Sequence, residues 1–242
     1  MLKVLCKNLI MWDDIQCSKD WIYSQIPDII KHIYENDISL VEKNYSQRIN
    51  EDDIDFSTIA LCYVNIIAGA VLSLGFKYAG SGNKEVFSLI SSIIQFYRKL
   101  KIVQTNKENL SMQSSAKKKN LIDKNTAQTC LCVCALSLSV VMAGTGDIDC
   151  FRLIRILRKR IEHNQANEPN SSYYGFNMAI NMSMGFLFLG SGAYTFSRSD
   201  LSIAALICAL YPVFPSSPSD NRYHLQALRH FYVLAIETRL LQ

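Results

Sequence analysis

The sequence is poor in proline and in net charge. Only five of its 242 residues are proline, and so few helix breakers favour helices over a loop-rich β-sheet protein. The formal net charge of +4 is small for a nucleic-acid-binding protein, in which basic residues concentrate on one face. Because 49% of the residues are hydrophobic, a chain of this length can bury a substantial core. These features favour a helical protein that binds no nucleic acid.

Complete catalytic and cofactor-binding motifs are also missing. The glycines at 80–82 lack the third glycine of a dinucleotide fingerprint and the Gly-Lys-Ser/Thr of a phosphate-binding loop. The turn at 190–192 is not a Gly-x-Ser-x-Gly nucleophile elbow. His224 and His230 are six residues apart and would not share one face of a helix. We therefore expect no enzyme activity, no cofactor and no small-molecule ligand.

The eight cysteines form no Cys-x-x-Cys pair. Cys130, Cys132 and Cys134 lie close together, but on a helix Cys132 points away from the other two. A zinc site needs about four converging ligands, and no histidine is near in the sequence. We expect no metal, and we interpret the cysteines as reduced, buried residues of a nuclear and cytoplasmic protein.

Three long runs carry no charged residue, at 57–76, 125–146 and 169–197. Each is long enough to cross a bilayer, which requires about 20 apolar residues. However, the runs contain Asn and Gln, and they are rich in Ala, Ser, Gly and Cys. Helices that are apolar all round can also lie buried in the centre of a soluble protein. We favour burial, and a polytopic membrane protein is the alternative from a different class.

A similar turn of small residues lies within, at the end of or just after each uncharged run. It reads AGSGN at 79–83, AGTGD at 143–147 and LGSGA at 189–193. Small residues five positions before the turn, such as Gly75 and Gly185, would let a neighbouring helix approach closely. Glycine adopts the positive φ that ends a helix sharply. We predict six structural turn residues: Gly80, Gly82, Gly144, Gly146, Gly190 and Gly192.

A partly exposed helix is predicted after each turn. Asn83 and Asp147 are N-cap residues for two amphipathic segments with basic ends, and Ser199 with Asp200 caps a third after an enlarged turn. A buried helix, a glycine turn and an exposed helix cannot bury their apolar faces alone, so such units must stack on their neighbours. The predicted fold is therefore all-α, an α-solenoid of helical hairpins.

One domain is predicted to cover residues 1–242, with about four hairpin units. Polar connectors are expected at 101–129 and 164–172. The opening residues 1–36 are predicted to form one or two helices and to begin a further one. Residues 222–241 are predicted as a final helical segment, which lacks the glycines and fits the repeat poorly.

Three segments resemble the proteasome/cyclosome repeats. They are IIAGAVLSLGFKYAGSGN at 66–83, LSLSVVMAGTGD at 136–147 and MSMGFLFLGSGAYTFSRSDLSIAALICALYPVFP at 182–215. The closing block DNRYHLQALRH at 220–230 is similar to the end of the repeat region in the largest scaffold subunits of the anaphase-promoting complex. The repeats alone do not separate this family from the two large non-ATPase scaffolds of the proteasome regulatory particle, which are the alternative.

The resemblance implies both an architecture and a function. The architecture is a curved or closed toroid of helical hairpins. The function is that of a non-catalytic scaffold in a mitotic ubiquitin ligase, which positions recognition and catalytic modules for ubiquitin-dependent protein degradation. The implied partners are other subunits of the anaphase-promoting complex and its coactivator, with no nucleic acid, membrane or small molecule.

Two sets of polar residues are candidate partner surfaces. Arg152, Arg155 and Lys159 form a basic stripe on the second exposed helix, and Arg158 and Arg160 widen it. The stripe is either a solvated helix face or a docking surface for an acidic partner. The second set either caps the last hairpin or contacts a neighbouring domain or subunit. It comprises Asn221, Arg222, Tyr223, His224 and Arg229.

Overall fold

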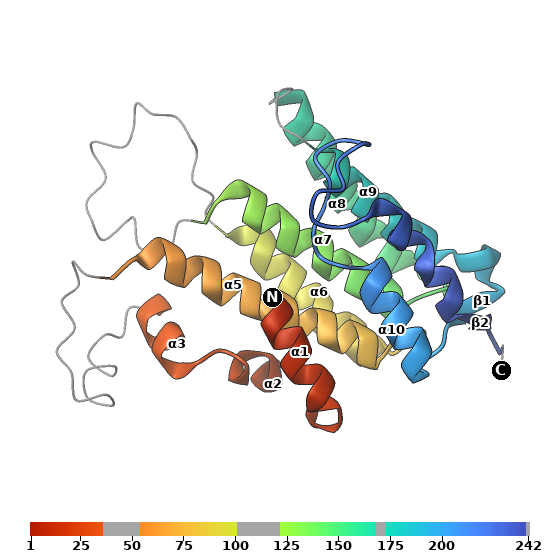
Figure 1. The fold of residues 1–242 in the computed structure, drawn as a ribbon, viewed down its shortest axis with the longest axis horizontal. Coiled ribbons are helices and arrows are strands. Elements are labelled where there is room, and N and C mark those ends of the chain that lie inside the picture. The colour runs from red at the N-terminus through yellow and green to blue at the C-terminus, as the bar shows by residue number, and fades with distance from the viewer. Residues whose placement is uncertain (36–53, 101–121, 168–172, 241–242) are drawn as a thin grey trace.

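The computed structural model of the chain is mostly helical, with two short strands near the C-terminus (Figure 1). The structure confirms one part of the all-α prediction, which is that the protein is mainly helical. The described residues are 1–35, 54–100, 122–167 and 173–240.

The three uncharged runs form a row of adjacent helices in the centre of the molecule. They are α5 (Phe56–Lys77), α7 (Lys124–Val141) and α9 (Tyr174–Leu187). Because α7 packs against both α5 and α9, nearly every side chain from its second turn onward is buried. Among the described helices, only α5 is long and apolar enough to cross a membrane, and 72% of its apolar stretch is buried inside the structure. Such burial is typical of a core helix.

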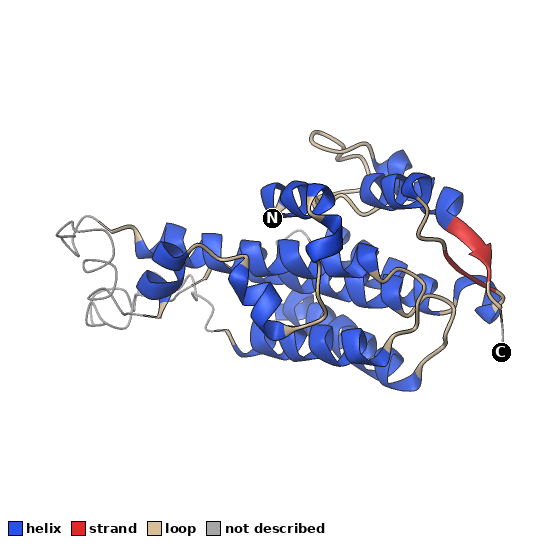
Figure 2. Cartoon of the chain, turned by 90° about the horizontal axis from the view of Figure 1, so that it is seen from below, coloured by secondary structure: helices blue, strands red, loops and turns tan. Residues whose placement is uncertain are grey.

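The amphipathic helices α6 (Lys84–Lys99) and α8 (Ile148–Asn167) cover one side of this row. The layers are visible in Figure 2. Helix α6 packs on α7, and α8 packs on α9, so each outer helix covers the inner helix of the following unit. Tyr97 of α6 is fully buried and donates its hydroxyl hydrogen to the carbonyl oxygen of Val64 in α5, at 2.6 Å. Each outer helix therefore joins two units.

Close approach between inner helices depends on Gly75. A Cβ atom at Gly75 would lie 2.8 Å from Cβ of Ser137 in α7, so the absent side chain lets α5 and α7 pack closely. The same prediction is wrong for Gly185, where nothing lies within 4 Å of the added Cβ position. The reason is that Gly185 lies on the exposed side of α9.

The opening residues form more and shorter helices than predicted. Pro27 precedes the last of them, and the Ser18 hydroxyl caps another by accepting from the backbone N–H of Trp21 at 3.0 Å. These helices pack on α5, where Asn8 is buried and donates to Ser73 at 3.1 Å. The elements are α1 (Leu2–Ile10), η1 (Trp12–Asp14), α2 (Lys19–Ser24) and α3 (Asp28–Tyr34).

The third glycine turn leads into a different C-terminal arrangement. The single helical segment predicted for 222–241 is wrong, because a 3-10 helix of ten residues is followed by a strand. That strand pairs antiparallel with a strand after the third turn, and Thr195 faces Glu237 in the register. Pairing between these two segments, which are far apart in the sequence, therefore holds the last residues in an extended strand instead of a helix. The elements are η5 (Leu189–Gly192), β1 (Tyr194–Phe196), α10 (Asp200–Ala209), η6 (Gln226–Ala235) and β2 (Ile236–Thr238).

The predicted connectors extend too far into the helices. Residues 124–129 belong to α7, because Asp123 caps this helix by accepting from the backbone N–H groups of Asn125 and Thr126. Residues 164–167 belong to α8. Ile122 and Asp123 directly precede α7, and the remaining predicted connector residues, 101–121 and 168–172, lie outside the described residues.

Candidate scaffold joints and interaction surfaces

All six predicted turn glycines adopt positive φ, from 53° at Gly190 to 91° at Gly192. In the first two turns the chain reverses from an inner helix into an outer helix. In the third turn Ser191 also has a positive φ, of 58°, and the chain continues into β1 before α10 begins. We call the three turns, at 79–83, 143–147 and 189–193, the glycine corners.

The first two glycine corners are joints between consecutive units. Both glycine N–H groups of a corner donate to carbonyl oxygens at the end of the next inner helix. The last carbonyls of a helix have no partner within the helix, so each corner caps the inner helix of the following unit. The bonds are Gly80 to Val140 at 2.9 Å, Gly82 to Val141 at 2.9 Å, Gly144 to Phe186 at 2.9 Å and Gly146 to Leu187 at 3.0 Å.

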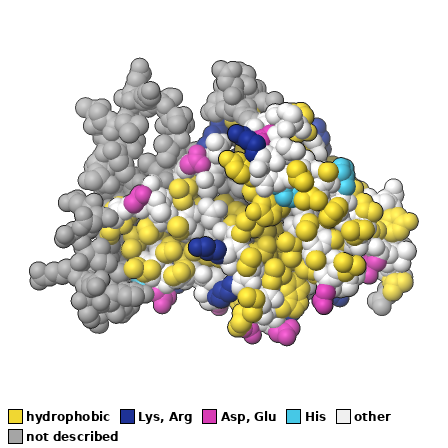
Figure 3. All heavy atoms as spheres, viewed as in Figure 1, with side chains coloured by type: hydrophobic (Ala, Val, Ile, Leu, Met, Phe, Trp, Pro, Cys, Tyr) yellow, Lys and Arg dark blue, Asp and Glu magenta, His cyan; other side chains and the backbone are white. Residues whose placement is uncertain are grey.

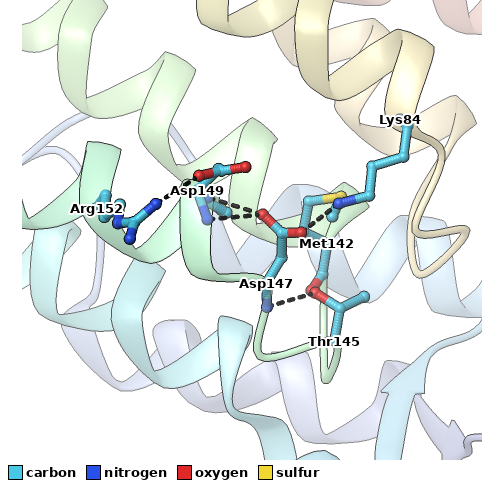
Figure 4. Close-up of polar contacts among 7 residues, drawn as sticks. Lys84, Met142, Thr145, Asp147, Asp149 and Arg152 are labelled. Carbon is cyan, nitrogen blue, oxygen red and sulfur yellow. Dashed lines mark hydrogen bonds and ion pairs between the residues drawn. The ribbon is translucent and has the colours of Figure 1, made fainter.

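Side chains reinforce the second corner (Figure 4). The Asp147 carboxylate accepts from the backbone N–H of Asp149 at 3.1 Å and of Cys150 at 2.9 Å, which caps α8 as predicted. The same carboxylate pairs with the ammonium group of Lys84, at the start of α6. Burial acts to raise the pKa of Asp147, but the bonds from Lys84 and Cys150 outweigh it and the pKa is lowered. Asp147 is therefore ionised while it links two outer helices.

Strand β1 crosses the first two corners at very short range. A Cβ atom at Gly80 would lie 2.2 Å from the carbonyl oxygen of Phe196, and one at Gly144 would lie 1.9 Å from that of Tyr194. The Thr195 hydroxyl lies 3.1 Å from the carbonyl oxygen of Gly80. The Arg239 guanidinium, just after β2, donates to the carbonyl oxygen of Gly144. The C-terminal strands thus close over joints formed by residues far earlier in the sequence, 115 positions for Thr195 and Gly80 and 95 positions for Arg239 and Gly144.

The basic stripe lies on the exposed face of α8. Arg152, Arg155 and Lys159 are exposed as predicted. Arg152 pairs with Asp149 one turn earlier, at 3.1 Å. Arg160 is half-buried, and its guanidinium donates to the carbonyl oxygen of Arg98 in α6 at 3.5 Å. The contact with Arg98 could not be predicted from the spacing within α8, because Arg98 lies in another unit.

The second candidate set is divided between surface and core. Asn221, Arg222 and Tyr223 are exposed, and Arg222 pairs with Asp220 at 3.0 Å. His224 and Arg229 are buried, with 9% and 4% of their surfaces exposed, so their prediction as surface residues is wrong.

Arg229 and His224 instead hold the end of α10. The Arg229 guanidinium donates to the carbonyl oxygens of Ala209 at 3.1 Å, Tyr211 at 2.7 Å and Val213 at 2.5 Å. The imidazole of His224 stacks on the Tyr211 ring at 5.1 Å. Burial lowers the pKa of Arg229 to about 10, so the group stays charged at neutral pH. These two residues therefore act as a cap at the end of α10, which is one of the two interpretations that the sequence allows for this set.

Comparison with known proteins decides between the alternatives. A family model described as APC1 fifth domain matches residues 1–237. The chain belongs to the anaphase-promoting complex subunit 1 family. This membership confirms the resemblance to the cyclosome scaffold. No comparison supports the proteasome scaffold or a polytopic membrane protein.

Three relatives named anaphase-promoting complex subunit 1 illustrate the match. Those from Dictyostelium discoideum and Homo sapiens are each 42% identical to the chain, and the one from Schizosaccharomyces pombe is 36% identical. The alignments cover 100%, 100% and 99% of this chain, but 11%, 11% and 14% of those relatives. The chain therefore spans about a tenth of the length of these curated relatives. A further relative, from Emericella nidulans, is named negative regulator of mitosis and is 36% identical.

In this subunit 1 family member four of the eight cysteines are buried and serve packing, whereas the prediction of burial is wrong for Cys6 and Cys208, which are exposed. Cys130, Cys132, Cys134 and Cys150 are buried, and burial raises the pKa of Cys130 and Cys132 to about 12. Thiols with such pKa values stay protonated and are poor metal ligands. Within the described residues, no three His, Cys, Asp or Glu side chains converge as a metal site would require.

The surface of the subunit 1 chain also carries apolar side chains. Figure 3 shows them over the face that includes α1 and α10. The exposed apolar residues include Ile10, the last residue of α1, at 83%, and Leu201 of α10, at 72%. Contiguous exposed apolar surface is typical of contact sites between proteins.

Proposed function

We propose that this chain is a non-catalytic scaffold region of the anaphase-promoting complex ubiquitin ligase. It positions recognition and catalytic modules for the ubiquitin-dependent degradation of proteins in mitosis. The observation that carries the proposal is the match of residues 1–237 to the subunit 1 family. The chemistry of the chain supports a role without catalysis, because its buried histidine and cysteines are committed to packing and capping.

The proposed architecture is an α-solenoid that forms part of a curved or closed toroid. Two consecutive glycine corners make the same pair of backbone bonds to the next inner helix, and a repeated joint of this kind supports a regular superhelical array. Each outer helix also covers the next inner helix. An array built this way is stiff along its length, which suits a scaffold.

The proposed partners are other subunits of the complex and its coactivator, in the nucleus and cytoplasm. No membrane or nucleic acid is part of the proposal. The exposed apolar side chains of α1 and α10 and the exposed cations of α8 supply two chemically different surfaces for such partners.

Co-purification from mitotic cells tests the function. The chain, carrying an affinity tag, is recovered with its bound proteins, which are quantified by mass spectrometry. We expect cullin-like and tetratricopeptide subunits and the coactivator. Recovery of ATPase-ring subunits instead, or of no complex at all, would overturn the proposal.

Glycine variants provide the matched comparison. Gly144→Ala places a Cβ atom against the Tyr194 carbonyl oxygen at a joint, whereas Gly185→Ala adds one in open space on α9. If the joints create the scaffold, Gly144→Ala should reduce recovery of the partner subunits and Gly185→Ala should not. Equal recovery with both variants would show that binding of the partner subunits does not depend on the geometry of the joints.

A further inference from the structure

We propose that the outer helices α6 and α8 together form one binding surface for an acidic segment of a partner protein. We call it the outer-helix basic surface. The proposal rests on the scaffold function, and it adds the chemical class of one partner. The surface comprises Arg98, Lys99, Arg155, Arg158, Lys159 and Arg160.

Two repeat units contribute to this surface. Arg98 and Lys99 end α6, and the guanidinium of Arg160 in α8 reaches the carbonyl oxygen of Arg98 at 3.5 Å. The contact joins residues 62 positions apart in the sequence. Lys99, Arg155 and Lys159 are exposed. The fold thus gathers cations that in the sequence belong to separate helices.

Helices α6 and α8 contain three acidic residues, which are Glu85, Asp149 and Glu162. Glu85 is in the first turn of α6, and Asp149 is in the first turn of α8, where it pairs with Arg152. Residues 86–100 and 150–161, whose side chains the structure describes, contain no carboxylate. Glu162 follows directly in α8, outside the residues whose side chains the structure describes, so cations outnumber carboxylates on these parts of the two helices.

Helix stabilisation accounts for only part of this arrangement. Cations favour the last turn of a helix because they complement its dipole, and this explains Arg98 and Lys99 at the end of α6. Helix α8 runs to Asn167, so Arg155 and Lys159 lie well before its last turn. Burial, and then the nearby charge of Arg98, lower the pKa of Arg160. Mutual repulsion of this kind costs folding stability, and an acidic partner would relieve it.

The chemistry of the surface favours carboxylates. Four of its six cations are arginine, whose planar guanidinium group binds carboxylates through paired hydrogen bonds. Ile156 lies among them on α8 and is 44% exposed, which adds an apolar contact. An acidic peptide segment with one aliphatic side chain fits this combination best.

Fluorescence anisotropy with a defined probe tests the inference. The probe is a labelled twelve-residue peptide of Glu and Asp with one central Leu, titrated with the full chain at low and moderate salt. The test variant is Arg155→Glu/Lys159→Glu. The control is Lys3→Glu/Lys7→Glu, which makes the same change in net charge on α1, where both lysines are exposed.

We expect the test variant to weaken peptide binding by about tenfold, because attraction is replaced by repulsion, and the control by about twofold or less. Arg155→Gln/Lys159→Gln should give an intermediate loss, and it guards against a folding defect. Equal losses in test and control variants, or no binding by the wild type, would overturn the inference. So would tighter binding of a single-stranded oligonucleotide of the same charge at this surface.

The two proposals fail in different ways. If peptide binding is absent while the wild-type chain still co-purifies with the subunits of the complex, only the basic-surface inference fails. If the chain recovers no subunits but binds the peptide through Arg155 and Lys159, the scaffold function fails and the surface stands.

Discussion

Asp147 combines a helix cap and a link between units in one carboxylate. It caps α8 through the backbone N–H groups of Asp149 and Cys150, and it pairs with Lys84 of the preceding unit. Asn83 occupies the same position in the first corner and caps α6 without a charge. An amide can therefore provide the cap, whereas the ion pair needs the carboxylate.

We expect Asp147→Asn to lose the ion pair and Asp147→Ala to lose the cap as well. The free energy of unfolding should fall by less than about 1 kcal/mol in the asparagine variant, because Lys84 is largely exposed. The alanine variant should lose about 1 kcal/mol more. Urea denaturation at neutral pH measures both. Equal losses would show that the side chain does not serve two purposes.

The ion pair also predicts a pH dependence. The pKa of Asp147 is lowered in the folded state, so the contribution of its charge is complete above the ordinary pKa of aspartate. It is lost as the pH falls through the lower, folded-state pKa. The stability difference between the wild type and Asp147→Asn should therefore shrink when urea denaturation is repeated at about pH 3. A difference that does not change with pH would contradict this.

Arg229 should matter more for stability than any exposed arginine. Arg229→Met removes donors from three carbonyl oxygens around the end of α10, and we expect a loss of about 2–4 kcal/mol in unfolding free energy. The control is Arg222→Met, which removes the exposed guanidinium that pairs with Asp220 and should cost much less stability than Arg229→Met. Thermal and urea denaturation provide the measurement. Similar losses in the two variants would contradict the capping role.

At the scale of elements, helix reversal depends on the left-handed glycines. We expect Gly144→Ala to be strongly destabilising, by about 2 kcal/mol or more, since it combines an unfavourable positive φ with a clash against β1. Gly185→Ala should be neutral or stabilising by up to about 1 kcal/mol, because alanine favours a helix interior. Urea denaturation of the two variants measures both changes in the free energy of unfolding. A mild effect of Gly144→Ala would mean that the corner tolerates rearrangement.

Much of the helical architecture could be predicted from local sequence. The uncharged runs gave α5, α7 and α9, and the cap residues Asn83, Asp147 and Ser199 gave the starts of the helices after the turns. The strands could not be predicted, because three residues form β1 only through pairing with β2, which lies about 40 positions later. Local propensity carries no information about such a partner.

At the scale of the whole molecule, several of the missed features join distant residues. The burial of Arg229 depends on carbonyl groups at and after the end of α10, and the partnership of Arg160 with Arg98 depends on stacking of two units. The glycines were expected to bend the chain, but not to donate to the next inner helix. Composition and spacing describe one unit at a time, whereas the packing of the helices depends on bonds between units.

Those inter-unit bonds predict slow hydrogen exchange in the glycine corners. Amides in surface turns usually exchange fast, but those of Gly80, Gly82, Gly144 and Gly146 donate to carbonyl oxygens of the next inner helix. Exchange then requires neighbouring units to separate. We expect these four amides to be protected about as well as those within α6, as measured by amide hydrogen exchange with NMR detection. Exchange at ordinary loop rates would show that the corners do not hold the units together.

The C-terminal strand should strengthen this protection at the second corner. Arg239→Met removes the guanidinium that binds the Gly144 carbonyl oxygen, so the amides of Gly144 and Gly146 should exchange about tenfold faster. The control is Glu237→Gln, at an exposed position of β2, which should leave both rates unchanged. If Arg239→Met accelerates exchange only within β1 and β2, the strands fold against the array without stabilising its joints. Faster exchange of the Gly144 and Gly146 amides would instead show that the C-terminal strands help to hold the second joint together.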